Sequence, residues 1–429
     1  LTTFMAMAYI LAVNPNILSA TGMNPDAILL ATALASFVGC MAMALLANYP
    51  FALAPGMGLN AYMAFTVCGN MGYSWQIALL AVFVEGLIFI VLSLTNVREA
   101  IFNAIPMALK KGVSAGIGLF IAFIGLQGAN LVVNDDSTLL TYVKFVGDFH
   151  TIGIGALLAL IGLFIIVVLH HKNIKGSILI GILATWILGM ICEAIGLYVP
   201  DGKEFYSLYP TFRMIDFGAF GTTFGQCFNV DFSGVDILNF IAVLFAFLFV
   251  DIFDTLGTLI GVSTKANMLD EEGKLPRIRP ALLADAIATS VGAIFGTSTT
   301  TTYVESSAGV AAGGRTGLSA MVTGLLFLLA IVFSPIFTAI PSFATAPALI
   351  FVGFLMISSI ISIDFEDITE AVPAYLAMLV MPLMYSISEG IALGVISYVV
   401  INLCCGKAKK IKPLMYILTV LFVLKYIFL

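Results

Sequence analysis

Apolar runs long enough to cross a membrane recur from one end of this 429-residue chain to the other. Most of these runs have about 17 to 25 residues, and a helix of that length spans a hydrocarbon core of ~30 Å. Hydrophobic residues make up 61% of the sequence and charged residues only 10%, far from the composition of a soluble domain. The chain is therefore expected to be an all-α polytopic membrane protein.

The runs form two groups of seven, separated by a polar stretch from Tyr198 to Gly234. The first group covers 1–18, 27–48, 51–67, 74–95, 109–128, 152–171 and 175–196. The second covers 236–262, 281–297, 298–312, 316–339, 345–362, 370–386 and 388–405. An odd number of spans in each half requires the two halves to be inverted, so the pattern predicts 14 transmembrane segments in two inverted repeats.

The third segment of each group is interrupted by small and polar residues. It reads FALAPGMGLNAYMAF in the first half and TSTTTTYVESSAGVAA in the second. Interrupted segments at matching positions of two halves are typical of secondary transporters, whose substrate site lies where the broken segments meet. The sequence therefore predicts a transporter, with its site at segments 3 and 10.

Basic residues test the topology independently, because cytoplasmic connections are enriched in Lys and Arg. With a cytoplasmic N-terminus, the inner connections hold 14 of the 18 basic residues. Lys144, Lys203 and Arg213 fall outside, and Lys425 lies in a last apolar segment, 413–429, that either spans or lies at the interface. We expect both native termini to be cytoplasmic. The inner residues are Arg98, Lys110, Lys111, Lys172, Lys175, Lys265, Lys274, Arg277, Arg279, Arg315, Lys407, Lys409, Lys410 and Lys412.

The interrupted segments suit a short pair of β-strands at membrane depth. Residues 299–304 are mostly β-branched or aromatic and favour an extended strand. In the first half, Pro55 lacks a backbone donor, while Gly56 and Gly58 allow close backbone approach. Non-helical backbone survives in a membrane only when it is buried against protein or lines a wet cavity. We expect the two strands to pair and each to lead into a half-helix.

Asn60 and Glu305 follow the two strands at nearly equivalent places. Ionisable groups at membrane depth are costly and usually functional, so Glu305 is the first candidate for a substrate contact. Asn60 has two readings that the sequence leaves open, a substrate ligand or a cap of its own half-helix.

A second acidic group lies on the span that opens the second half. Asp251, Asp254 and Thr258 are spaced i, i+3 and i+7, which places them on one face of a helix. Two carboxylates one turn apart repel each other when both are ionised, so at least one is expected to hold a proton at neutral pH. Such a group can load and release a proton as access alternates. The alternative is that both carboxylates bond only to neighbouring helices.

Other polar residues give weaker signals. We interpret Glu85 as an accessory tether of its span, Asn14 as a kink or cap, and Asp285 as interfacial. The acidic run 364–370 is expected to be a solvated connection, and the basic run 407–412 an anchor to anionic lipid, not a nucleic-acid patch. Neither the six cysteines nor the three histidines have the spacing of a metal site or a catalytic constellation, so no enzyme, metal or cofactor is predicted.

Three phrases resemble the nucleobase cation symporter-2 family, and specifically its AzgA-like purine permease branch. They are APGMGLNAY, VDIFDTLGTLIGV and GTSTTTTYVESSAGVAAGGRTGL. The resemblance implies a core domain from the first four segments of each half and a gate domain from the others. The core would comprise residues 1–97 and 236–340, and the gate would comprise residues 98–197 and 341–406. An outer connection would cover 198–235, and a basic tail with an extra apolar segment would cover 407–429.

The resemblance also implies proton-coupled uptake of hypoxanthine, guanine or adenine across the cell membrane, with a homodimer through the gate domain. It assigns the base to Asp254 and Glu305, and it marks Gly58, Asn60 and Asp251 as important positions. The proton would be carried by Asp251, Asp254 or Glu305. Phe253, Tyr303 and Phe65 are candidate stacking faces for a planar base.

A uracil or xanthine symporter of the same family is the main alternative. Those branches carry a Glu on segment 8 with a His four residues later, whereas this chain has Asp254 and Thr258 at these positions. They also carry an Asn-x-Gly pattern after the strand carboxylate, whereas this chain has Ser306, Ser307 and Ala308 there. An anion exchanger is disfavoured because three carboxylates crowd the predicted site. Nothing in the sequence suggests the repeated selectivity ring of a channel.

Overall fold

The computed structural model of the chain is mainly helical. The structure does not describe a few side chains within the helices, and that of Phe253 is one of them. The residues that the structure describes are 1–94, 105–135, 137–143, 145, 148–200, 207–210, 216–232, 236–265, 268, 275–337 and 339–428.

Nine helical stretches in the described part of the chain are long and apolar enough to cross a membrane. They are Thr2–Thr21, Pro25–Ala47, Trp75–Leu94, Met107–Gly128, Phe149–His171, Ser177–Ala194, Ile278–Phe295, Gly317–Phe337 and Ser342–Ile361. Shorter apolar helices cover Asn239–Ile252, Ile368–Leu383, Glu389–Cys404 and Pro413–Leu424. All of these coincide with apolar runs of the sequence, so the prediction of a multi-pass membrane protein is confirmed.

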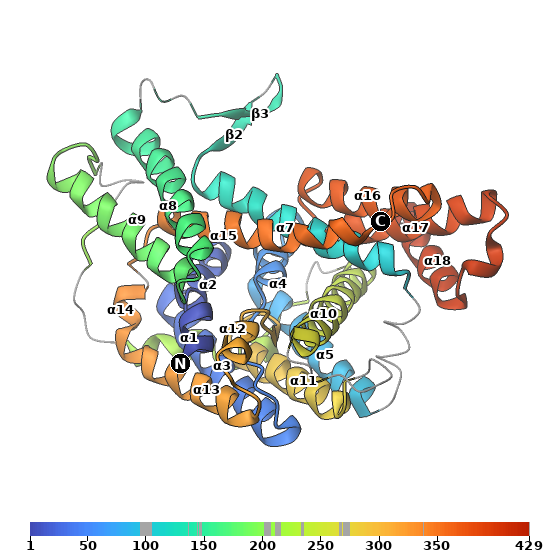
Figure 1. Cartoon of the computed structure of the whole chain (residues 1–429). Helices are drawn as coiled ribbons and strands as arrows, with labels where there is room; N and C mark the ends of the chain where they lie inside the picture. Colours follow the sequence, from blue (N-terminus) through green and yellow to red (C-terminus); the bar gives the residue numbers. More distant parts are fainter. Residues whose placement is uncertain are drawn as a thin grey trace.

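Figure 1 labels the elements in chain order. The first half contains α1 (Thr2–Met7), α2 (Ile10–Leu18), α3 (Pro25–Ala42), β1 (Leu53–Pro55), α4 (Met57–Ala61), η3 (Tyr62–Asn70), α5 (Trp75–Leu94), α7 (Met107–Gly128), β2 (Val132–Asp135), β3 (Leu139–Tyr142), α8 (Ile154–His171) and α9 (Ser177–Ala194). The second contains α10 (Ile237–Lys265), α11 (Ile278–Phe295), β4 (Thr300–Thr302), α12 (Ser306–Ala311), α13 (Gly317–Ala330), α14 (Ser334–Phe337), α15 (Ser342–Ile357), α16 (Ile368–Leu383), α17 (Ile387–Cys404) and α18 (Pro413–Phe428).

Polar residues at the breaks between apolar runs begin several helices. Asn24 caps α3 by accepting hydrogen bonds from the backbone N–H groups of Asp26 and Ala27, and Pro25 occupies the first helical position. Asp367 and Ser386 cap α16 and α17 in the same way. A side-chain oxygen at the N-cap pairs with an otherwise unbonded backbone donor. Because the capping residues are polar, they interrupt the apolar runs, and the hydropathy pattern therefore locates these helix starts well.

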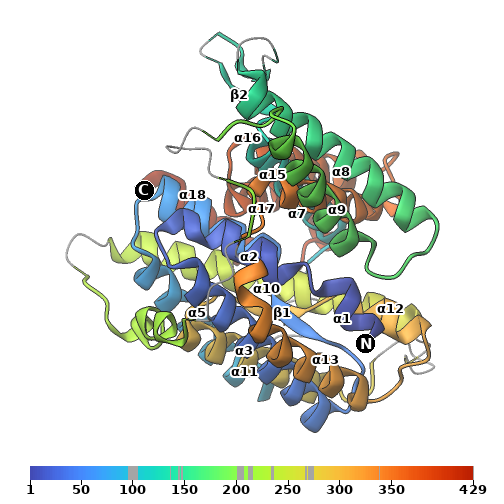
Figure 2. The ribbon, with the colours of Figure 1, turned by 90° about the vertical axis from the view of Figure 1, so that its left-hand side faces the viewer.

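The helices gather into two bodies, one above the other in Figure 2. The first body contains α1 to α5 and α10 to α13. In it, α11 packs on both α3 and α5, and α13 packs on α3. The second body contains α7 to α9 and α15 to α17, with α15 packed on α7 and α8 and α16 packed on α7 and α17. Each body draws helices from both halves of the sequence.

Strands β1 and β4 form a two-stranded antiparallel sheet inside the first body. The pairing of segments 3 and 10 predicted from the sequence is thereby confirmed. A second sheet was not predicted: β2 and β3 form an exposed hairpin after α7, with Val132 opposite Tyr142. It projects from the second body in Figures 1 and 2. A hairpin of two four-residue strands is too short for its alternation to stand out from an irregular connection.

The charged runs near the C-terminus pair with each other. Lys407 and Lys410 each approach Asp367 at 3.2 Å, and Lys410 reaches Glu370 at 2.7 Å. The acidic run is therefore not merely a solvated connection, and two lysines of the basic run are held by protein carboxylates. Helix α18 packs on α17, and its Tyr426 hydroxyl donates a hydrogen bond to Glu389 at the start of α17.

Candidate functional site

The β1–β4 crossing is the frame on which the candidate site is built. Pro55 lies opposite Thr300, and the register continues with Ala54 opposite Thr301 and Leu53 opposite Thr302. The Gly56 N–H extends the ladder by donating to the Thr299 carbonyl at 2.9 Å. The threonine side chains of β4 are at most 2% exposed. The sequence forms a strand here because β-branched residues fit an extended, buried backbone.

Glu305 stands between the end of β4 and the start of α12. Its Oε1 accepts a hydrogen bond of 2.7 Å from the hydroxyl of Tyr9, which is fully buried where α1 meets α2. Sequence reasoning missed Tyr9, because a lone tyrosine in an apolar run gives no signal of its partner. A buried phenol normally needs a hydrogen-bond partner, and here that partner is the carboxylate predicted to contact substrate.

Asp254 lies on α10 beside the same crossing. A methyl group built on Gly56 would come within 3.4 Å of its Oδ2, so this carboxylate rests against the start of α4. Asp254 is close enough to both Glu305 and Asp251 for direct electrostatic repulsion. The structure therefore brings together the three carboxylates that the sequence selected, and helix α10 contacts both α4 and α12 beside them.

Asp251 belongs to a cluster with Thr255, Asp285 and Thr301, which we call the acidic cluster. The Thr255 hydroxyl lies 2.7 Å from Asp251 Oδ1, 3.1 Å from both oxygens of Asp285 and 2.8 Å from the Thr301 hydroxyl. Asp251 and Asp285 are fully buried. The interpretation of Asp285 as interfacial is wrong, because its side chain is fully buried and lies within hydrogen-bonding distance of Thr255 on α10. The only sequence feature that could have identified Asp285 is the presence of a carboxylate inside an apolar helix.

A single hydroxyl proton cannot serve two carboxylates at once. With Thr255 between them, Asp251 and Asp285 compete for the same donor at short range. Thr255 therefore links Asp251 on its own helix to Asp285 on α11 and to Thr301 of β4.

Asn60 is fully buried near the end of α4, one residue before its last residue. Its amide Nδ2 lies 3.5 Å from the Pro55 carbonyl, and its Oδ1 has no hydrogen-bond partner among the described residues. Gly56, not Asn60, is the N-cap of α4, which leaves the capping interpretation without support. Tyr303 also bonds to the Pro55 carbonyl, through its hydroxyl at 2.5 Å. Two predicted site residues thus converge on one carbonyl of β1.

The remaining predicted residues are placed as follows. A methyl group on Gly58 would lie 2.8 Å from Cγ2 of Ile117 on α7, so at Gly58 the first body packs closely against the second. Thr258 is buried on α10 and has no hydrogen bond to a described residue. The side chain of Phe253 lies outside the described part of the chain. Phe65 is half-buried on η3 and makes an edge contact with Tyr385.

Two buried polar residues hold the crossing from behind. Glu85 on α5 accepts a hydrogen bond of 2.8 Å from the Thr299 hydroxyl, as expected for an accessory tether. The Asn14 amide donates to Thr32 at 2.7 Å and to Thr297 at 3.0 Å. Asn14 thus ties α2 to α3 and to the segment before β4. Asn14 therefore joins separate segments, whereas our interpretation of the sequence places a local kink or cap there.

Comparison with known proteins places the chain among permeases. Residues 1–393 match the sequence profile of a family described as "Permease family". The guanine/hypoxanthine permease PbuG of Bacillus subtilis is 47% identical over 438 residues, covering 100% of this chain and 95% of its own. The adenine permease AdeQ of Escherichia coli is 40% identical over 429 residues, covering 100% and 91%.

Solved structures with the same fold include more distant proteins. The transmembrane domain of the cyanobacterial bicarbonate transporter BicA superposes with a TM-score of 0.63 at 16% identity, over 92% of this chain and 97% of that one. The murine Slc26a9 anion transporter in its inward-facing state gives a TM-score of 0.60 at 11% identity, over 94% and 67%. At these identities the likeness concerns the fold alone.

Proposed function

The chain belongs to the nucleobase cation symporter-2 family of permeases, and on that premise we propose that it is a secondary active transporter that takes up purine nucleobases together with protons. Hypoxanthine, guanine and adenine are the expected substrates. One observation carries the proposal above all: Glu305, braced by Tyr9, and Asp254 lie together at the β1–β4 crossing.

The chemistry of a purine base suits these groups. A base is neutral and planar, and its edge presents N–H donors beside ring-nitrogen and carbonyl acceptors. Carboxylates at Glu305 and Asp254 would accept from the N–H groups, and the amide of Asn60, whose Oδ1 is unused among the described residues, could meet the other edge. Tyr303 and Phe253 would supply ring faces, while Gly58 and Thr258 would shape the slot.

We place proton coupling at the same carboxylates. Asp254 interacts electrostatically with both Asp251 and Glu305, so a proton on Asp254 would relieve its repulsion with each of them. Asp285 extends this set through Thr255. Binding of a base against Glu305 and Asp254 would favour the protonated set, which links substrate and proton in one step. No cofactor beyond the coupling proton is proposed.

The two bodies of the fold support movement of one against the other. We assign the first body as a core domain, residues 1–97 and 236–340, and the second as a gate domain, residues 98–197 and 341–406. The 14 segments of two inverted repeats would divide between them. The core carries the carboxylates, so its displacement against the gate would expose the site to each side in turn, as in an elevator.

We propose the cell membrane as the location, with the native termini cytoplasmic, and a homodimer through the gate domain. The clustering of basic residues on the inner connections supports this orientation. A uracil or xanthine symporter of the same family is the alternative, and the named purine permeases at 40–47% identity favour the purine.

Uptake into proteoliposomes tests the proposal. Labelled hypoxanthine should accumulate when the lumen is alkaline relative to the outside, and less so without a pH gradient. Excess unlabelled guanine or adenine should compete, and excess uracil should not. Glu305→Ala should lose uptake, whereas Glu366→Ala, at an exposed site in the 364–370 connection, should retain it. Full uptake by Glu305→Ala, or uptake indifferent to the gradient, would overturn the proposal.

A further inference from the structure

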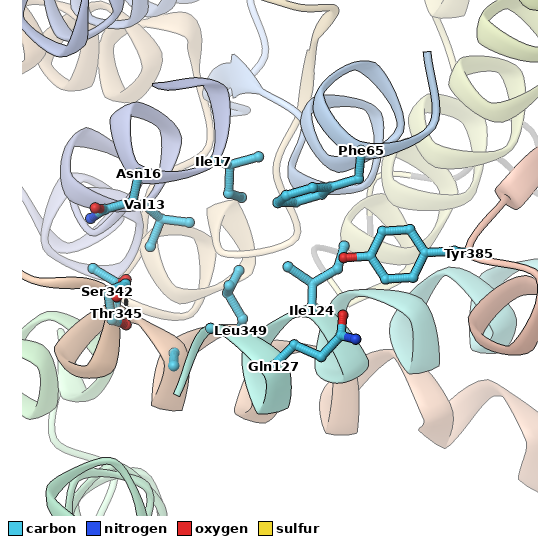
Figure 3. A pocket seen from close by; sticks show the side chains of 12 residues that line it. Val13, Asn16, Ile17, Phe65, Ile124, Gln127, Ser342, Thr345, Leu349 and Tyr385 are labelled. Atoms are coloured by element: carbon cyan, nitrogen blue, oxygen red, sulfur yellow. Dashed lines mark hydrogen bonds between the residues drawn. The ribbon is translucent and has the colours of Figure 1, made fainter. Parts of the chain in front are cut away.

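A cavity separate from the carboxylates lies where the two bodies meet. Its volume is about 150 Å³. Helix α2 and segment η3 of the first body form one wall, and α7 and α15 of the second body form the opposite wall (Figure 3). The turn between α16 and α17 closes one end with Tyr385. The cavity thus lies on the surface along which the core would move against the gate.

The two walls are apolar. Val13 and Ile17 from α2 face Leu349 of α15 and Ile124 of α7, and Phe65 adds an aromatic ring beside Ile17 (Figure 3). A cavity of this size with aliphatic walls accepts a flat ring of the dimensions of benzene. The walls therefore favour a planar ligand over a compact or charged one.

The two ends are polar. At one end, Asn16 uses its Nδ2 to donate to the carbonyls of Ala12 and Ile340, which leaves its Oδ1 as an acceptor, and Ser342 and Thr345 of α15 lie on the same side of the cavity. At the other end lie the Gln127 amide and the Tyr385 hydroxyl, and neither has a hydrogen-bond partner among the described residues. Apolar walls with a few donors and acceptors at the rim are what a flat heterocycle requires.

The cavity is a near neighbour of the carboxylate site. Val13 follows Tyr9 by four residues, and Phe65 follows Asn60 by five. On α7, Ile124 lies seven residues beyond Ile117, which contacts Gly58. At a rise of 1.5 Å per residue these steps correspond to roughly 6 to 10 Å along the helices. The cavity and the carboxylate site are therefore neighbours along α2, η3 and α7.

We propose that this cavity is a second binding site for a purine nucleobase, occupied between one face of the membrane and the carboxylate site. The proposal rests on the proposed transport function and adds to it a place where substrate waits. Phe65 and Tyr385 touch edge to face at 5.8 Å, and the Thr66 hydroxyl holds the Tyr385 carbonyl at 2.9 Å. These contacts join the two bodies beside the cavity, so its occupancy would be coupled to their separation.

Substrate protection of an introduced thiol tests the second site. Ser342→Cys places a thiol at one polar end of the cavity, at a side chain that is exposed in the native chain, and Phe354→Cys places one on the same helix at a side chain that is 63% exposed and outside the cavity. Each change is made in the otherwise native chain and in Glu305→Gln. Purified protein in nanodiscs is alkylated with and without hypoxanthine, and the labelled peptide is quantified by mass spectrometry.

The proposal predicts protection that does not depend on Glu305. Hypoxanthine at about ten times its Kd for the cavity should slow alkylation of the Ser342→Cys thiol about tenfold, both in the native background and in Glu305→Gln. Adding Gln127→Leu should reduce this protection in the Glu305→Gln background, and the Phe354→Cys thiol should be unaffected throughout. Protection that disappears with Glu305→Gln, or that never occurs, overturns the second site. Failure of the transport proposal has a different signature, the absence of purine uptake by the native chain.

Discussion

The hydroxyl of Tyr9 donates a hydrogen bond of 2.7 Å to Oε1 of Glu305, although 296 positions of sequence separate the two residues. The bond joins the first apolar run to the junction that follows β4. It fixes the direction of a carboxylate that would otherwise turn freely at the start of α12. A substrate-binding carboxylate that is already held in one orientation loses less conformational entropy when the substrate binds than a freely rotating one does.

Tyr9→Phe should therefore weaken purine binding without unfolding the protein. The change keeps the ring and removes one hydrogen bond to a charged group, which is worth about 1.5–3 kcal/mol, or roughly 10- to 100-fold in affinity. Uptake kinetics should show an increased KM for hypoxanthine. Tyr375→Phe, on the half-exposed face of α16, is the matched control and should leave KM unchanged. An unaltered KM in Tyr9→Phe would remove Tyr9 from the site.

Gly58→Ala should impair transport through packing between the bodies. Its new methyl group would lie 2.8 Å from Ile117 Cγ2, so α4 and α7 must separate locally. We expect uptake to fall by about tenfold or more at unchanged expression. Ile117→Ala removes the clashing atom and should restore part of the activity in the double variant. Gly221→Ala, where no atom lies within 4 Å of the added methyl group, should be neutral. Absence of rescue would mean that Gly58 acts through something other than this contact.

Thr255→Val should destabilise the protein by about 1–3 kcal/mol, because the acidic cluster loses the hydroxyl shared by Asp251 and Asp285. Valine has nearly the same shape as threonine, so a packing defect is not expected. Thermal unfolding of the purified protein would measure the change, and the pH dependence of uptake should change with it. Thr255→Ser keeps the hydroxyl and should behave like the native chain. Equal stability of Thr255→Val and the native chain would count against the cluster.

The Asp367 ion pairs should contribute stability that depends on pH. Hydrogen bonds from Thr369, Lys407 and Lys410 lower the pKa of the Asp367 carboxyl well below its ordinary value. A carboxyl with a depressed pKa in the folded state adds stability that is fully present above its unfolded pKa of about 4 and is lost as the pH falls through the lower folded value.

Asp367→Asn tests this expectation, because asparagine retains the helix cap of α16 and removes only the charge. The Tm of Asp367→Asn should be slightly below that of the native chain at pH 7, and the difference should shrink below pH 4 and in high salt. Glu366→Gln, in the same connection, should show no such difference. A gap between the two Tm values that widens with acid would contradict the assignment.

Most of the helices and both broken segments were predictable from the sequence because their signals are local. A run of apolar residues needs no partner to be recognised, and the strand of threonines stands out against its helical surroundings. The β2–β3 hairpin was missed, since its strands have no distinctive period. The pairing of 364–370 with 407–412 was also missed, because each charged run reads as solvated when it is considered alone.

The sequence by itself determined that this chain crosses a membrane repeatedly, that segments 3 and 10 are interrupted and pair, and that Asp251, Asp254 and Glu305 are the unusual carboxylates. These features follow from hydropathy and from the cost of charge in a membrane. Only the tertiary structure decided what those carboxylates meet. Tyr9 reaches Glu305 because α1 packs against α12, and Asp285 joins Asp251 because α11 packs beside the crossing. Partners far apart in sequence are chosen by helix packing, which no local pattern encodes.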